Sequence, residues 1–562
     1  MRTALLVRNP PEKESLQTGV LVMGGGGTGQ LAAAYLRMRF PNLAVTVVEG
    51  PHKNRPIVGE SLVEVSVDFL LELGFGTHLV EKHYPKYGLT YYFKRDIGNP
   101  ADRTYVVDEI PTAPPILSFQ INRFTFDREV RRRNLQNGVQ LIEGTVTGVE
   151  INGAGRHVVT VRNPDGEKQT LHARWLVDAT GRNRLLAKQL QLQEPVQEQK
   201  NVFWFRLKNF DPDILTQIQA IKKQNRCYVP YYATHHFFGK GNWIWYIPIR
   251  SPENESLVSI GITYRKGVYP YSEPRTMEQF LDCVGREHAV IVDLVRSGEV
   301  VDTNFYGSYM WECRRHYSAD RWYVIGDAGD TVDPLYSVGL ALSSLQIRQI
   351  TAIIQRELDG GDTKEFTEDL DTAVAAFQRS VTRDTTRLYE CMEDPYQCHL
   401  RIHLAVSKLF HIGLPLLLNG YLWDPVGVKL VNWFASLETL EADSVAFRDL
   451  IRAVAVNPKN CALSNFIKVQ SGESMNFGFY EHHREEDIPA SLRRLAFKLV
   501  RLRLLLVRKL GWRGLMWFSQ HRALLKDVLR GLLLVLFYRA KLRESRLGRM
   551  IVNFGRAEHS KC

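Results

Sequence analysis

The chain opens with an apolar run, a glycine-rich turn and a second apolar run. A short strand is predicted at 20–23, and the glycine-rich stretch 24–29 follows it directly. An alanine-rich helical pattern covers 30–39, and a second strand at 44–48 ends in Glu49. This order is typical of a βαβ dinucleotide-binding unit, whose glycines let a pyrophosphate approach backbone N–H groups at a helix N-terminus. Glu49 is placed to accept hydrogen bonds from ribose hydroxyls, and the candidate turn residues are Gly24, Gly26, Gly27, Thr28 and Gly29.

Further along the chain the apolar runs become shorter and more irregular. Strands are predicted at 139–151, 158–161, 170–177 and 322–325. Between 201 and 264 the pattern is β-rich and crowded with aromatic residues, which indicates a second sheet that roofs a cofactor pocket. Beyond residue 340 helical periodicity prevails. The predicted fold class is therefore α/β, a Rossmann-like domain with an inserted β-rich substrate domain and an α-helical C-terminal region.

These patterns divide the chain into six segments. An N-terminal extension precedes the dinucleotide-binding domain, which itself contains inserted parts of the substrate domain. The predicted boundaries are 1–18 for the extension, 19–200 for the dinucleotide-binding domain, 201–310 for the β-rich substrate domain, 311–360 for the return to the first domain, 361–490 for a helical region and 491–562 for a basic amphipathic tail.

Charge changes this picture only at the C-terminal end. The net charge is +11, yet residues 491–562 hold 18 Lys and Arg against three acids, which leaves a slightly acidic body. A nucleic-acid-binding protein would spread basic residues over a folded face with stacking aromatics, so no nucleic-acid partner is expected. In the tail, leucines repeat at helical spacing and basic residues gather on another face. It is either a helical cover of the body or an interfacial surface for an anionic membrane or an acidic carrier protein.

Composition narrows the class of protein further. A hydrophobic fraction of 44% supports a large core and excludes wholesale disorder. The seven cysteines are scattered without a Cys/His cluster, so neither a disulfide scaffold nor a metal site is predicted. No stretch approaches the ~18 consecutive apolar residues of a membrane-spanning helix, and the N-terminus lacks the apolar segment of a signal peptide. A cytoplasmic protein is expected, with peripheral membrane association through the tail as the alternative.

Three motifs place the chain near a known family. The glycine turn with Glu49, the sequence DATGR at 178–182 and the sequence GDAGDTVDPLYSVG at 326–339 occur together in FAD proteins of the aromatic-hydroxylase type. Within that group, WIWYIP at 243–248 resembles the WxWxIP signature of flavin-dependent halogenases. The resemblance spans roughly residues 19 to 400. It implies an FAD-binding domain of the aromatic-hydroxylase type and a halogenase that uses FADH2, oxygen and chloride or bromide in secondary metabolism.

The same resemblance implies roles for individual residues. In the family, hypohalous acid forms at the flavin, two tryptophans shield the flavin from the substrate, and a lysine meets the acid in a separate pocket. Trp243 and Trp245 match the tryptophans, and Lys86 matches the lysine in the family's K-x-G-x-x-x-x-F stretch, although Lys82 and Lys94 are close in sequence. An ammonium group can polarise hypohalous acid by hydrogen bonding, and the amine could instead carry a haloamine.

The halide site implied by the resemblance consists of backbone N–H groups at Val338 and Gly339. Such groups at a helix start suit a weakly basic anion. Two residues depart from the family pattern: Tyr336 stands where tryptophan halogenases carry a glutamate, and Thr331 stands where many members carry phenylalanine. Without that glutamate, a more electron-rich ring such as a phenol or pyrrole is expected, either free or tethered to a carrier protein.

Arg123 and Asp327 complete the implied FAD contacts, Arg123 near the flavin and Asp327 on the ribityl chain. Only one dinucleotide fingerprint is visible, so a separate flavin reductase is the expected partner. Two alternatives stay open: an FAD-dependent monooxygenase or reductase of the same fold, and a non-catalytic flavoprotein scaffold. The WIWYIP sequence opposes the first alternative, and Lys86 with the intact glycines opposes the second.

Overall fold

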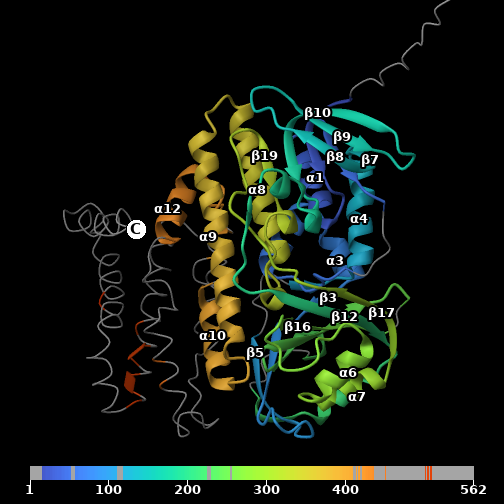
Figure 1. Ribbon diagram of the computed structural model, residues 1–562, viewed down its shortest axis with the longest axis vertical. Helices are drawn as coiled ribbons and strands as arrows, with labels where there is room; N and C mark the ends of the chain where they lie inside the picture. Colours follow the sequence, from blue (N-terminus) through green and yellow to red (C-terminus); the bar gives the residue numbers. More distant parts are fainter. Residues whose placement is uncertain are drawn as a thin grey trace, which may run out of the picture.

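The computed structural model describes residues 16–435 except 52–56, 111–117, 224–229, 254–255, 409–412, 414–415 and 418–419, together with scattered positions between 450 and 529. The N-terminal extension up to residue 15, the later part of the helical region and most of the basic tail lie outside the described residues. Two sheets lie one beyond the other, and long helices run along one side of both (Figure 1). The predicted α/β fold class is confirmed, whereas the six segment boundaries stay predictions.

A seven-stranded sheet forms the first body, with the strand order β7-β2-β1-β10-β9-β8 and β19 paired to β10. Five of these strands run parallel, and β9 and β8 return antiparallel. Side chains of β1 alternate between two cores: Val20 and Val22 point into one, and Leu21 and Met23 into the other. The uninterrupted apolar run is therefore explained by burial on both faces. The bounds are β1 (Leu16–Met23), β2 (Val45–Glu49), β7 (Gln140–Glu143), β8 (Thr145–Glu150), β9 (His157–Arg162), β10 (Lys168–Asp178) and β19 (Trp322–Val324).

An eight-stranded sheet forms the second body, in the order β13-β5-β4-β14-β15-β16-β12-β17. Aromatic side chains stack between neighbouring strands, as in the pair Tyr92 and Phe237 with ring centroids 4.3 Å apart. Cross-strand stacking of this kind stabilises a sheet beyond the burial of area. The bounds are β4 (Leu89–Lys94), β5 (Thr104–Ile110), β12 (Lys200–Lys208), β13 (Gln219–Lys223), β14 (Thr234–Gly239), β15 (Asn242–Arg250), β16 (Ser256–Arg265) and β17 (Glu299–Tyr306).

Helices cover both bodies, and two small sheets, β3 (Tyr84–Lys86) with β6 (Ser118–Gln120) and β11 (Gln193–Glu194) with β18 (Glu312–Cys313), complete the fold. Helix α1 begins at Gly27, three residues before its predicted start, because the glycine turn leads directly into it. The other helices are α2 (Glu64–Glu72), α3 (Gly76–Lys82), α4 (Arg123–Gln136), α5 (Leu185–Gln189), α6 (Met277–Gly285), α7 (Ala289–Arg296), α8 (Gly339–Leu358), α9 (Lys364–Tyr389), α10 (Pro395–Lys408) and α12 (Pro425–Ala435).

Helix α9 links the two bodies. Leu370 and Val374 lie in the core of the first body, whereas Leu388 and Tyr389 are buried with aromatic residues of the second.

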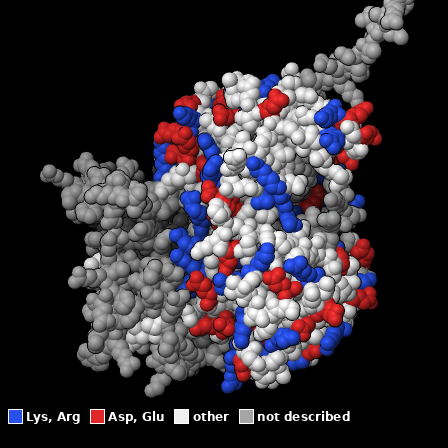
Figure 2. All heavy atoms as spheres, in the orientation of Figure 1, with Lys and Arg blue, Asp and Glu red and all other residues white. Residues whose placement is uncertain are grey.

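Basic and acidic side chains intermingle over the described part of one face of the molecule (Figure 2).

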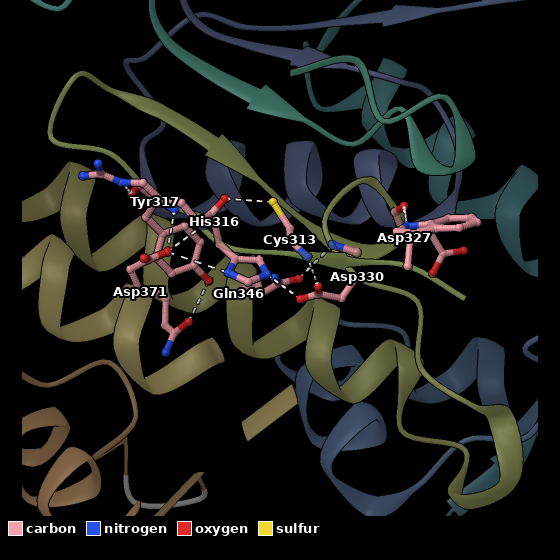
Figure 3. Close-up of polar contacts among 11 residues, drawn as sticks. Cys313, His316, Tyr317, Asp327, Asp330, Gln346 and Asp371 are labelled. Carbon is pink, nitrogen blue, oxygen red and sulfur yellow. Dashed lines mark hydrogen bonds and ion pairs between the residues drawn. The ribbon is translucent and has the colours of Figure 1, made fainter. Parts of the chain in front are cut away.

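A buried histidine joins α9 to the loop after β19. The imidazole Nε2 of His316 contacts the carboxylate of Asp330, and the backbone N–H of His316 donates to Asp371 Oδ1 at 2.6 Å (Figure 3). The second ring nitrogen, Nδ1, lies 3.7 Å from that same oxygen. Burial alone would lower the pKa of His316, but the two carboxylates raise it to about 9. His316 is therefore an imidazolium at neutral pH, and the second aspartate of the GDAGD sequence has a structural partner.

This cluster predicts a loss of stability at alkaline pH. The folded-state pKa of His316 of about 9 lies above that of an unfolded histidine, near 6.5. The stabilisation is therefore fully present below about pH 6.5 and is lost as the pH rises through the folded-state pKa, a change on the order of 3 kcal/mol. We expect the melting temperature of the wild type to approach that of His316→Gln as the pH rises from 6.5 to 9.5. A constant difference between their melting curves would contradict this charge assignment.

Candidate active site

A cavity of ≈ 430 Å³ lies between the two bodies. The first body contributes the glycine turn at Gly26 and Gly27, the second contributes Trp243 and Trp245, and the loop before α8 contributes Gly339. The cavity thus collects three of the sequence motifs that lie far apart along the chain.

The glycine turn needs its glycines because backbone segments approach closely there. Gly24 has φ +111°, and a Cβ added to it would lie 2.3 Å from the carbonyl oxygen of Ala179. A Cβ on Gly29 would lie 1.9 Å from the carbonyl oxygen of Gly24. Helix α1 begins next to the cavity without a side-chain cap and without an acid in its first turn. Its first N–H groups and the open space at Gly26 fit the pyrophosphate of FAD.

Glu49 ends β2, as predicted, and its carboxylate is engaged by neighbouring helices. Glu49 Oε1 accepts a hydrogen bond from Arg131 Nε at 2.9 Å, and Oε2 accepts one from Gln30 Nε2 at 3.1 Å. These contacts fix the carboxylate at the end of the strand. Its contact with a ribose stays a prediction.

The DATGR sequence packs directly against the glycine turn. The buried carboxylate of Asp178 accepts hydrogen bonds from the backbone N–H of Thr180 at 2.9 Å, from its hydroxyl at 2.6 Å and from the N–H of Leu186 at 2.7 Å. This holds Ala179 against Gly24, so Asp178 has an architectural role. Sequence reasoning singled out the motif but not this function.

Arg123 and Asp327, which the family resemblance implies as FAD contacts, both line the cavity, and their contacts with FAD stay predictions. The guanidinium of Arg123 donates to both oxygens of Asp127, at 3.0 and 2.9 Å, and to the carbonyl oxygen of Val58 at 2.8 Å. Helix α4 begins at Arg123, and Asn122 caps it by accepting a hydrogen bond from the backbone N–H of Phe124. Burial raises the pKa of Asp327, and the positive charge of Arg123 lowers it.

Trp243 and Trp245 lie on one face of β15 and both line the cavity. Their ring centroids are 5.7 Å apart, and the ring planes meet at 47°. Trp243 Nε1 donates to the hydroxyl of Tyr389 at 2.9 Å, and Trp245 Nε1 donates to Ser259 Oγ at 3.2 Å. Each indole is therefore both packed and held by a hydrogen bond, which fixes its orientation toward the cavity.

The predicted halide loop leads into the N-terminus of α8. Ser337 adopts the left-handed conformation with φ +57°, Val338 caps the 20-residue helix without a side-chain hydrogen bond, and Gly339 faces open space. Ser337 and Gly339 line the cavity. Backbone N–H groups at this helix start carry partial positive charge. They can hold a halide ion next to the space that fits FAD.

A buried ion pair anchors this loop. Asp333 Oδ1 accepts from the backbone N–H of Leu335 at 3.1 Å, and Oδ2 accepts from Lys200 Nζ at 2.9 Å and from the Tyr389 hydroxyl at 2.8 Å. Lys200 and Asp333 are completely buried. Sequence reasoning missed Lys200, Asp333 and Tyr389. Position 333 could have been found as the acid before Pro334 in the motif, but the sequence carries no signal for its two partners.

Lys86 ends β3 and is buried, with 4% of its surface exposed. Its Nζ donates to Ser61 Oγ at 2.9 Å and to the carbonyl oxygen of Leu62 at 3.0 Å. Burial lowers the pKa of Lys86 to about 8, while the carboxylate of Glu64 acts in the opposite direction. Ser61 itself lines the cavity. The structure therefore places Lys86 one hydrogen bond away from a residue of the cavity wall.

The two histidines before β15 have different surroundings. His235 Nδ1 pairs with the hydroxyl of Tyr92 at 2.9 Å, whereas His236 lines the cavity with its ring 5.5 Å from that of Trp243. Burial, and then the charge of Lys86, lower the pKa of His236 to about 3, so this imidazole is neutral.

Glu60 also lines the cavity, and burial raises its pKa to about 7. Sequence reasoning did not single out Glu60, Ser61 or Thr234, whose places in the wall depend on the tertiary fold.

Within the described part of the chain, no group of three or more His, Cys, Asp or Glu residues could hold a metal ion. The described helices include none with the length and apolar character needed to cross a membrane. The thiols of Cys283, Cys313, Cys391 and Cys398 are buried and form no disulfide bond among the described residues.

Comparisons with known proteins agree with this site. A family described as tryptophan halogenase matches residues 19–95 and 101–391, which is more than half of the chain. A flavin-dependent halogenase of Dictyostelium discoideum is 25% identical over 510 residues, covering 83% of this chain and 78% of that protein. A 1H-pyrrole-2-carbonyl peptidyl-carrier protein chlorinase of Pseudomonas fluorescens is 29% identical over 350 residues, covering 58% of this chain and 74% of that protein.

The fold has a counterpart among solved structures. The halogenase PltM in complex with phloroglucinol and FAD superimposes with a TM-score of 0.62 and 16% sequence identity, covering 85% of this chain and 96% of that one. With the family match over both bodies, the chain belongs to the tryptophan halogenase family and is a flavin-dependent halogenase.

Proposed function

We propose that this flavin-dependent halogenase acts on an electron-rich aromatic ring, a phenol or a pyrrole. Tyr336 carries the proposal, because it occupies the position where tryptophan halogenases carry a glutamate. Burial raises the pKa of its phenol well above the ordinary value, so the side chain stays neutral and supplies no carboxylate base. A ring whose oxygen or nitrogen feeds electrons into the reacting carbon needs less help with proton removal. The names of two similar proteins fit this class, since one acts on a pyrrole group and the other binds phloroglucinol, a phenol.

FAD is the cofactor that the residues around the cavity fit. The N–H groups at Gly26, Gly27 and Thr28 would hold its phosphates, and Arg123 and Asp327, which line the same cavity, would contact the flavin and its ribityl chain. When bound and reduced, FAD supplies with oxygen the oxidation that converts halide into hypohalous acid. The N–H groups of Val338 and Gly339 hold the halide, and Trp243 and Trp245 separate this space from the aromatic substrate.

Lys86 then directs the acid at the ring. Its ammonium donates a hydrogen bond to the oxygen of hypohalous acid, which makes the halogen more electrophilic. The ring carbon takes the halogen, and the oxygen leaves as water with the ring proton. A pKa of about 8 keeps most Lys86 side chains charged at neutral pH while leaving the amine accessible to the haloamine route.

Replacement of Lys86 tests this function directly. Wild-type enzyme with FADH2, oxygen and chloride or bromide is expected to give the mass shift of one halogen on a phenol or pyrrole, presented free and carrier-bound. Lys86→Ala is expected to lower halogenation by roughly a hundredfold or more, because the lysine acts after hypohalous acid has formed. FAD binding and FADH2 oxidation are expected to persist.

Lys82→Ala is the matched control, since Lys82 is exposed and close in sequence. Near-normal halogenation by Lys86→Ala would remove Lys86 from its role. Hydroxylated products without halogen would instead favour the monooxygenase alternative, and FAD binding without turnover on any ring would favour the scaffold.

The partner that supplies electrons is a separate flavin reductase. Only one dinucleotide fingerprint is present, and it lies where FAD fits. NADH or NADPH added to the flavin-loaded protein is therefore expected to leave the flavin oxidised, as followed by its visible absorbance. Rapid stoichiometric bleaching by either nucleotide alone would contradict this expectation.

The basic tail, outside the described residues, is proposed as a peripheral membrane contact. Its 18 Lys and Arg and its leucine periodicity favour an anionic surface, at about 1 kcal/mol per basic residue near such a surface. We expect the full chain to sediment with anionic liposomes at low salt and to be released at high salt, because salt screens these charges. A variant with Arg494, Lys498, Arg501 and Arg508 changed to Gln should sediment less. If neither protein ever sediments, the tail is a cover of the body or a surface for a carrier protein.

A further inference from the structure

Two hydroxyl groups stand between the cavity and Lys86. Ser61 and Thr234 both line the cavity, and both are buried. Ser61 Oγ lies 2.9 Å from Lys86 Nζ on one side and 2.9 Å from Thr234 Oγ1 on the other. They come from the segment before α2 and from the start of β14, so the tertiary fold brings them together. The three side chains form a continuous row from the cavity wall to the lysine.

The chemistry of the groups sets one direction in this row. A lysine ammonium donates only, so Ser61 Oγ accepts from Lys86. Between Ser61 and Thr234 either hydroxyl can be the donor, so this bond can reverse when a ligand binds at the wall. Gln120 Nε2 donates to the carbonyl oxygen of Tyr232 at 2.8 Å and lies 3.5 Å from Thr234 Oγ1, which keeps this part of the wall in place.

We propose that Ser61 and Thr234 form a hydroxyl relay that receives hypohalous acid from the cavity and transfers it to Lys86. This inference rests on the role proposed above for Lys86. Hypohalous acid, like water, donates one hydrogen bond and accepts others, so it can bind first at Thr234 and then replace Ser61 Oγ as the acceptor of the Lys86 N–H. Only hydrogen bonds are exchanged along the relay. The covalent step comes afterwards, when ArH and HOX give ArX and water.

The residues around the relay are chemically compatible with hypohalous acid, which is an oxidant. Hydroxyl groups resist the oxidant, whereas thiols and thioethers are oxidised readily. His236, which lines the same wall and senses the charge of Lys86, is neutral because burial lowers its pKa to about 3. The carboxylate of Glu64 is the charged group that favours the ammonium form of Lys86. Lys86 therefore presents its donor charge directly behind the two hydroxyl groups of this wall.

The test measures where the oxidant goes. Thr234→Val and Ser61→Ala each remove one hydroxyl with little change in shape. We expect the halogenated product formed per oxygen consumed to fall about tenfold, the effect of losing one hydrogen bond of about 1.4 kcal/mol. Hypohalous acid captured in solution by an added β-diketone should rise correspondingly. FAD affinity, measured by absorbance titration, and FADH2 oxidation should stay unchanged, and Thr234→Ser should restore product formation.

Two matched variants separate the relay from packing. Thr90→Val and Ser66→Ala also remove buried hydroxyls, but these hydroxyls have no hydrogen-bond partner among the described residues. If they lower the product yield as much as the relay variants do, the effect is one of packing and the relay is wrong. A second readout uses flavin-free protein treated with dilute hypochlorous acid. Chloramine formation at Lys86, followed by peptide mass spectrometry, should be slower in Thr234→Val than in Thr90→Val.

The outcomes also distinguish the relay from the proposed role of Lys86, on which the relay rests. If Lys86→Ala abolishes halogenation while both relay variants keep the wild-type product yield, the relay is overturned and the role of Lys86 stands. If Lys86→Ala retains halogenation, the role of Lys86 fails and the relay fails with it.

Discussion

The geometry of the site depends on one buried carboxylate, that of Asp333. Burying an ion pair costs several kcal/mol per ion unless every remaining polar group is paired. Asp333 meets this condition because its two oxygens accept from Lys200, Tyr389 and the backbone of Leu335. The Tyr389 hydroxyl in turn accepts from the indole of Trp243. The loop before α8 and the tryptophan that faces the cavity are therefore linked through Tyr389, and a shift of Asp333 would separate two buried charges.

Around this unit, three groups with different proposed roles occupy separate places in and behind the cavity wall. The glycine turn fits phosphates with backbone N–H groups, the paired tryptophans present a packed aromatic wall, and Lys86 lies outside the lining behind Ser61. Burial lowers the pKa of Lys86 to about 8, which shows how strongly this position is shielded from solvent. Under the proposed function, an oxidant formed in the cavity meets the hydroxyl group of Ser61 before it meets the lysine.

Sequence reasoning found the parts that local geometry demands. The glycine turn and the acid at the end of β2 follow from the strand pattern and from backbone clearance, whereas the two tryptophans follow from the resemblance to the WxWxIP signature. Each of these groups lies in the predicted element. The groups that it missed acquire their function through contacts across the fold. Lys200 and Asp333 are 133 residues apart, and Ser61 and Thr234 are 173 apart, so no local pattern could indicate either pair. The second aspartate of the GDAGD sequence shows the converse, because its motif is recognisable but its partner, His316, is not.

The distribution of acids relates the site to its substrate. Glu60, Asp127 and Asp327 line the cavity that fits FAD, and Arg123 is paired with Asp127. Burial raises the pKa of Glu60 and of Asp327, and the charge of Arg123 offsets only part of this rise. On the loop before α8, the neutral phenol of Tyr336 stands at the position where tryptophan halogenases carry a glutamate. The acids of the cavity lining thus surround Arg123, whereas this position of the loop before α8 offers no carboxylate. Under the proposed function the ring has to stabilise its own positive charge after taking the halogen, and this electronic demand is the reason for proposing a phenol or a pyrrole.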